Sequence, residues 1–133
     1  MSLAYNKFNV FVADVANKVH NLGSDTITVL LTDTLPVSTN VYADIVQISY
    51  TNLSSRTVPF TSSGQSSGLY KLIQGALVLT ASGAVAQWRY IVLCNSTASK
   101  LISWYDSGAE QNMVSSDTFT ITPDATNGTL QLT

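Results

Sequence analysis

The chain has one histidine, His20, and one cysteine, Cys94, and their side chains are the best suited to nucleophilic chemistry. An imidazole that accepts the proton of a thiol would create a catalytic nucleophile. However, Cys94 is expected on the same face of a predicted strand as Trp88, Tyr90 and Val92, so we expect it in the core as a small hydrophobic group. His20 comes at the end of a predicted helix, where we expect a terminal structural role. The sequence therefore predicts no catalytic pair, and one His with one Cys is too few for an ordinary zinc site.

The acidic residues do not gather into a pattern that predicts catalysis or metal binding. They are spread one to a loop or strand end, which is ordinary turn chemistry: Asp14, Asp25, Asp33, Asp44, Asp106, Glu110, Asp117 and Asp124. Only Asp106 and Glu110 are close in sequence, in a region that we expect to be a loop. A glycosidase would need two convergent carboxylates, and the chain has no Gly-x-Ser-x-Gly elbow and no phosphate-binding glycine loop. We expect no catalytic residues, no metal site and no cofactor.

Three aromatic residues offer an alternative of another class. Trp88, Trp104 and Tyr105 could together form a platform on which a sugar stacks, which would make the chain a carbohydrate-binding β-sandwich module. Such a platform needs exposed rings beside polar partners on one face. We favour the simpler interpretation, in which Trp88 fills the core and Trp104 packs across a hairpin.

The elements that must position these residues divide the chain in two. Residues 6–22 predict an N-terminal α-helix, because the apolar residues recur three or four positions apart. Gly23 is a plausible residue to end this helix. The apolar stripe consists of Phe8, Phe11, Val12, Val15, Val19 and Leu22.

Residues 26–133 show the alternation of short β-strands, with Ser- and Thr-rich connections. We expect 87–95 to be a central strand, because both of its faces are mostly apolar. Residues 62–68 have the composition of a flexible loop. The last two strands alternate cleanly around a six-residue loop, 123–128, that contains Asn127-Gly128, which predicts a hairpin. The strands are expected at 26–32, 41–51, 57–60, 69–73, 76–81, 87–95, 100–106, 118–122 and 129–133.

About eight strands spaced some ten residues apart are typical of a sandwich or barrel. We therefore predict a mainly β, single-domain protein over residues 1–133. Its expected architecture is an antiparallel β-sandwich of jelly-roll type with one N-terminal α-helix packed on a side or end.

Composition narrows the function classes. Charged residues make up 11% of the chain, against about 25% in a typical protein, so much of the surface must be polar but neutral and inexpensive to desolvate. The six basic residues are scattered, so we expect no nucleic-acid partner. The apolar runs are too short for a transmembrane helix, and residues 1–7 lack the pattern of a secretory signal. With a lone cysteine, these features indicate synthesis in a reducing cytoplasm.

Several segments of the chain are recognisable together: residues 5–9, 19–26, 89–93 with Asn95, 101–108, 118–120 and 127–130. These segments resemble small structural proteins of tailed bacteriophages, and the resemblance extends over nearly the whole chain. Cys94 departs from it, where an aromatic residue is expected, and so does the Ser-rich stretch 51–67, where relatives are richer in Gly.

The resemblance implies a non-enzymatic virion protein, and most specifically a capsid decoration or cement protein. Such a protein stabilises the head by binding the major capsid protein, commonly as a dimer or trimer. The N-terminal helix and the Ser-rich loops are the expected contact elements. A tail- or fibre-associated virion protein is the alternative within the same class. In either case the chain would be made in the host cytoplasm and located in the virion, with no membrane partner.

Overall fold

The computed structural model describes residues 5–124, 126 and 128–132. The chain is mainly β, as predicted, with one α-helix among these residues. The elements in chain order are β1 (Asn6–Lys7), α1 (Asn9–Ala16), β2 (Ile27–Thr32), the 3₁₀ turn η1 (Tyr42–Asp44), β3 (Phe60–Ser66), β4 (Leu69–Gln74), β5 (Leu77–Thr80), β6 (Trp88–Asn95), β7 (Lys100–Gln111), β8 (Thr118–Ile121) and β9 (Leu130–Leu132).

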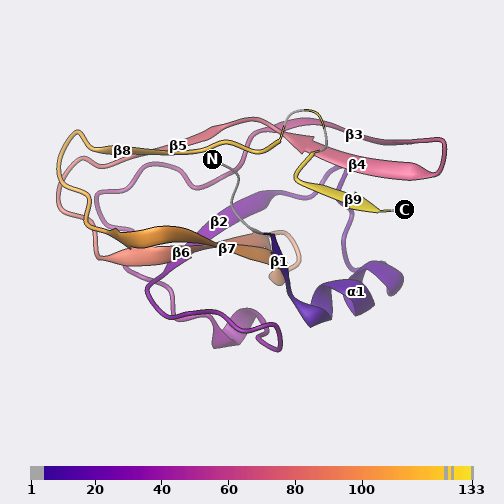
Figure 1. Cartoon of the computed structure of the whole chain (residues 1–133), viewed down its shortest axis with the longest axis horizontal. Helices are drawn as coiled ribbons and strands as arrows, with labels where there is room; N and C mark the ends of the chain where they lie inside the picture. Colours follow the sequence, from indigo (N-terminus) through magenta and orange to yellow (C-terminus); the bar gives the residue numbers. More distant parts are fainter. Residues whose placement is uncertain (1–4, 125, 127, 133) are drawn as a thin grey trace.

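The strands described here form three sheets, and all their pairings are antiparallel. The largest sheet has the order β1-β7-β6-β2, a second has the order β3-β4-β9, and β5 pairs with β8. Figure 1 shows β5, β8, β3 and β4 along one side of the molecule and β6 and β7 along the other. An antiparallel, mainly β fold with one helix is thus confirmed, whereas the jelly-roll arrangement stays a prediction.

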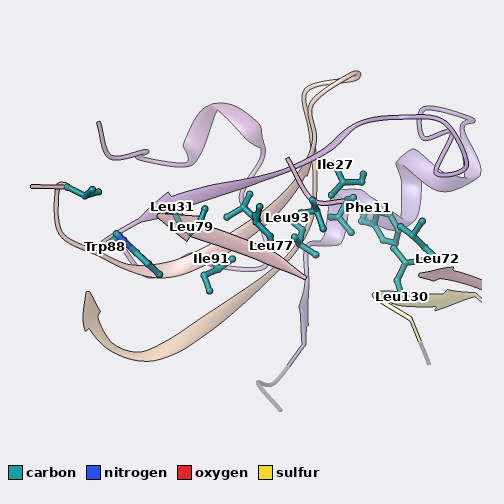
Figure 2. Close-up of a cluster of buried hydrophobic side chains, with 14 of the residues drawn as sticks. Phe11, Ile27, Leu31, Leu72, Leu77, Leu79, Trp88, Ile91, Leu93 and Leu130 are labelled. Carbon is teal, nitrogen blue, oxygen red and sulfur yellow. The ribbon is translucent and has the colours of Figure 1, made fainter. Parts of the chain in front are cut away.

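One continuous hydrophobic cluster, the main core, contains residues from all three sheets and from α1. Leu77 and Leu79 of β5 are buried in it, while Val78 and Thr80 between and after them are exposed. Leu77 and Leu79 lie in the same cluster as Trp88, Ile91 and Leu93 of β6. Figure 2 shows this cluster as far as Phe11 of α1, Leu72 of β4 and Leu130 of β9. Alternation along the short strands thus supplies one buried face to each sheet.

A smaller hydrophobic cluster, the second core, lies on the opposite face of the largest sheet. It contains Phe8, Leu30, Ile45, Val92, Cys94 and Leu101. Consecutive β6 residues therefore point into different cores: Ile91 and Leu93 into the main core, Val92 and Cys94 into the second. The prediction that this strand is central is confirmed, since β6 pairs with β2 on one side and β7 on the other.

The N-terminal helix is shorter than the predicted 6–22, because residues 6–7 pair with β7 and the helix ends at Ala16. Lys18 takes a left-handed conformation with φ 62°. Its N–H donates to the carbonyl of Val15, and the N–H of Val19 donates to that of Asp14. These two bonds form a Schellman motif, which stops a helix. Lys18, and not Gly23, is therefore the residue that ends α1.

Three predictions for the middle of the chain are wrong. The expected strand 57–60 is an irregular stretch with one isolated bridge at Thr57, and only Phe60 belongs to a strand, β3. The expected strand 41–51 is replaced by η1 and an irregular stretch, in which the N–H of Ile48 donates to the carbonyl of Leu31 in β2. The expected loop 62–68 is mostly strand β3, which forms a hairpin with β4. Ser67 and Gly68 both have positive φ, 53° and 80°, as a two-residue type I′ turn requires. The tight turn at Ser67-Gly68 thus allows β3 to pair with β4, although the composition of residues 62–68 is typical of a loop.

The predicted C-terminal hairpin is also wrong. β8 pairs with β5, and β9 pairs with β4, so the two strands belong to different sheets. Of the expected Asn127-Gly128 turn, Asn127 lies outside the described residues. Gly128 has φ 84°, and the N–H of Thr129 beside it donates to the carbonyl of Leu72 on β4. Alternation gave each strand an apolar face, but it carried no information on the partner strand.

Candidate functional site

A partly buried polar network joins the segment after α1 to the end of β6. The Asn95 carboxamide, which is fully buried, lies 2.6 Å through its Nδ2 from Asp25 Oδ2 and 3.0 Å from His20 Nδ1. Its Oδ1 accepts the N–H of Ala98 at 3.1 Å. His20 also packs on the ring of Phe11, with 5.2 Å between centroids. Sequence reasoning placed His20 at a helix end and missed this network, whose members lie 70 and 75 positions apart.

His20 and Cys94 do not form a catalytic pair. Cys94 precedes Asn95 on β6, but its thiol is buried in the second core, on the face opposite to the main core. Burial raises the pKa of the Cys94 thiol to about 11, so it stays protonated at neutral pH. The interpretation of Cys94 as a small buried hydrophobic group agrees with this position.

Asp106 and Glu110 lie on strand β7 and not in a loop as predicted. The Asp106 carboxylate accepts two hydrogen bonds from Arg89, at 2.9 and 3.1 Å, and a third from the N–H of Gly108 at 2.8 Å. The Arg89 guanidinium, followed by the Gly108 N–H, lowers the pKa of Asp106. This carboxylate is therefore held ionised in a surface ion pair, which is the opposite of what a general acid needs.

Other carboxylates act in turns, as predicted. Asp44 accepts the N–H of Val41, and Asp117 accepts the N–H of Val114. Across the described part of the chain, no three His, Cys, Asp or Glu side chains lie close enough together to hold a metal ion.

The three aromatic residues of the sugar-platform alternative do not share a surface. Trp88 is fully buried and packs edge-on against Phe119, with ring centroids 4.9 Å apart. Tyr105 packs on the main core, whereas Trp104 packs on the second core. The predicted face of β6 was also wrong at Trp88, because a register shift between Trp88 and Tyr90 turns Trp88 to the side of Ile91. Such a bulge re-aims side chains without leaving a pattern in the sequence.

A surface of exposed apolar side chains lies on residues 33–46, which we call the strap. The strap is anchored by Pro36 and Ile45, which are buried, and by the N–H of Asn9, which donates to Ser38. Asp33 and Asp44 are its only charged residues. Its exposed apolar residues are Leu35, Val37, Val41, Tyr42 and Val46.

Strand β3 of the β3–β4 hairpin presents a surface that has no charged residue. Within β3 only Ser63 is partly buried, and no residue of β3 is charged. β3 is also an edge strand of its sheet, and the hairpin extends away from the largest sheet in Figure 1.

The described residues include no helix long and apolar enough to cross a membrane. Comparisons with family models, curated proteins and solved structures found nothing that matches this chain.

Proposed function

We propose that this protein is a non-enzymatic structural component of a tailed-bacteriophage virion, namely a decoration or cement protein that binds the major capsid protein of the head. The observation that carries the proposal is the strap. Large apolar side chains on a surface with few charges are what a protein partner can cover at little desolvation cost. The resemblance of segments throughout the chain to phage structural proteins supplies the identity of the partner.

The strap has the properties of an interface that is formed in advance. Leu35 is 56% exposed and Val46 is 64% exposed, so each could lose much apolar area on binding. The backbone between them is held by side chains: Asn40 accepts the N–H of Val37, and Asp44 accepts the N–H of Val41. A segment that is already ordered loses little conformational entropy when it binds.

The finer parts of the proposal concern fold and assembly. We assign the arrangement of short antiparallel sheets around a shared core to a jelly-roll-type sandwich. In a dimer or trimer, the strap of each copy would meet the capsid at the same time. Symmetric repetition then multiplies a weak contact through avidity. The location would be the virion, after synthesis in the host cytoplasm.

Stoichiometry tests the location in the virion. Quantitative mass spectrometry of purified particles should give copies of this chain in a simple ratio to the major capsid protein. A few copies per particle would instead indicate the tail or fibre. Absence from the particle would overturn the proposal.

Variants of the strap test the surface. Leu35→Asp and Val46→Asp each place a charge on the proposed contact surface. We expect at least a tenfold loss of binding to capsids that lack this protein, since burying an unpaired carboxylate costs several kcal/mol. Val114→Asp is the matched control, because Val114 is 57% exposed and lies outside the strap. Co-sedimentation with capsids measures the binding, and an equal loss in all three variants would count against the strap as the contact surface.

A further inference from the structure

The hydrogen bonds of Asn95 determine which nitrogen of His20 carries a proton. Oδ1 of Asn95 must accept the N–H of Ala98, and one hydrogen of its Nδ2 must go to the carboxylate of Asp25. If the amide oxygen and nitrogen of Asn95 were exchanged, its NH₂ group would face the N–H of Ala98, and its oxygen would face the carboxylate of Asp25. Neither pair could form a hydrogen bond. Because Asn95 is fully buried, water cannot relieve either conflict. The remaining hydrogen of Nδ2 therefore points at His20 Nδ1, which must accept it, and the neutral imidazole carries its proton on Nε2.

Protonation of His20 is incompatible with this arrangement. An imidazolium has a hydrogen on both nitrogens, so its Nδ1–H would meet the Nδ2–H of Asn95 at a separation of 3.0 Å. The charged groups around the ring have opposite effects on the pKa of His20. Asp14 on α1 and Asp25 favour the imidazolium, while Lys100 on β7 opposes it. Burial has the largest effect and lowers the pKa of His20.

The network holds a segment that has few other attachments to the sheets. Within residues 18–25, the backbone bonds are local; for example, Asn21 O accepts from both Ser24 and Asp25. In the described residues, side-chain hydrogen bonds between this segment and the sheets run through Asn95. Leu22 adds a buried apolar contact.

The same segment forms one wall of a groove. The groove has a volume of about 340 Å³, and its opposite wall comes from the β3-β4-β9 sheet. It is lined by Val15, His20, Asn21, Leu22, Gly23, Ser63, Tyr70 and Leu132. A movement of residues 18–25 would therefore widen the groove and uncover its apolar lining.

We propose that His20, Asn95 and Asp25 form an acid-sensitive latch, in which neutral His20 holds residues 18–25 against the end of β6 and protonated His20 releases them. Release opens the groove between this segment and the β3-β4-β9 sheet. The latch is a property of the fold and does not depend on the proposed role in the virion.

The pH range follows from the direction of the pKa shift. In the released segment His20 has its ordinary pKa of about 6.5, and in the closed latch the pKa is lower. The released form therefore binds the proton more tightly. The latch is closed at full strength above about pH 6.5, and the opening constant rises by up to about tenfold per pH unit as the pH falls from there to the closed-state pKa.

NMR of the native protein gives the first test. Because the chain has one histidine, ¹⁵N-labelled histidine yields a single imidazole. At pH 7.5 its shifts should report a protonated Nε2 and an unprotonated Nδ1, and its titration midpoint should lie below 6.5. A proton on Nδ1 at pH 7.5, or a midpoint at or above 6.5, would overturn the proposal.

Hydrogen exchange with mass spectrometry gives the second test. After correction for intrinsic exchange rates, protection of peptides covering residues 18–25 should fall as the pH is lowered from 7.5 to 5, with little change in peptides from β6.

Two variants provide the comparison. In His20→Gln the side-chain carbonyl can still accept a hydrogen bond from Nδ2 of Asn95 but does not titrate, so protection should become independent of pH. Arg89→Gln removes a charge away from the latch and should keep the native response. Unchanged protection in the native chain, or the same pH response in His20→Gln, would rule out the latch. If His20→Gln does not fold, the NMR titration and the hydrogen exchange of the native protein still test the latch.

Discussion

At the scale of single residues, burial determines what each reactive group of this protein can do. Cys94 is buried among apolar side chains, and burial raises the pKa of its thiol to about 11. The thiolate, which is the reactive form, is then a very small fraction at neutral pH. Asp106, in contrast, lies at the surface, and its pKa is lowered by Arg89. Neither group has the proton affinity that catalysis near pH 7 would use.

Cys94 should therefore resist alkylation in the folded protein. We expect iodoacetamide to modify it at least a hundredfold more slowly than an unfolded thiol at pH 7.5, because the reagent must wait for the second core to open. Ser62→Cys provides the control, since Ser62 lies on the exposed strand β3. Mass spectrometry of the labelled chain distinguishes the two sites, and comparable rates at both would contradict a closed second core.

At the scale of elements, a few backbone positions decide where a helix stops and which strands pair. Lys18 ends α1 in a left-handed conformation without being glycine. Gly128 brings the chain onto β4 so closely that a Cβ there would lie 2.5 Å from the carbonyl oxygen of Leu72. The β4–β9 pairing thus depends on one residue that has no side chain.

Gly128→Ala should be destabilising, because the added methyl group meets backbone and the position has φ 84°. We expect the free energy of unfolding to fall by about 1–3 kcal/mol. Gly64→Ala is the matched control within β3, where the added Cβ has open space and φ is not positive. That variant should be neutral or stabilised by up to about 1 kcal/mol. Urea denaturation followed by circular dichroism measures both, and equal effects would show that β9 tolerates displacement from β4.

At the scale of the whole molecule, the largest sheet joins two hydrophobic cores. Neighbouring residues of β6 belong to different cores, and β7 contributes Ile102 to the main core and Leu101 to the second. Loss of either strand would expose both cores. The two cores should therefore unfold together.

The two tryptophans provide a direct test of this coupling, since Trp88 lies in the main core and Trp104 packs on the second. Trp104→Phe leaves Trp88 as the single tryptophan, and Trp88→Phe leaves Trp104, so selective excitation of tryptophan reports on one core in each variant. Within each variant, the urea midpoint from fluorescence should coincide with that from far-ultraviolet circular dichroism. A separation of the two midpoints in the Trp88→Phe variant would mean that the second core melts independently.

The sequence by itself determined the mainly β fold class and the positions of most strands. Alternation predicted the strands that became β2, β4, β5, β6 and β7, because a strand with a buried face must repeat every two residues. The continuous apolar stretch around Ile91 and Val92 also predicted that β6 is central. The strap was not predicted, because the alternation of Val46, Ile48 and Tyr50 indicates a strand over 41–51. In the structure this segment is not a strand, and of these three residues only Val46, at the end of the strap, is exposed.

The tertiary structure alone decided the pairings, the end of the helix and the contacts of His20. Partner strands are chosen by packing over the whole chain, so the clean alternation of β8 and β9 did not reveal that they belong to different sheets. The bulge beside Trp88 and the left-handed Lys18 depend on local geometry that several sequences can adopt. The latch depends on side chains brought together from positions 20, 25 and 95. The periodicity of the sequence cannot predict such contacts, because it indicates which face of a helix or strand is buried and not which residues cover that face.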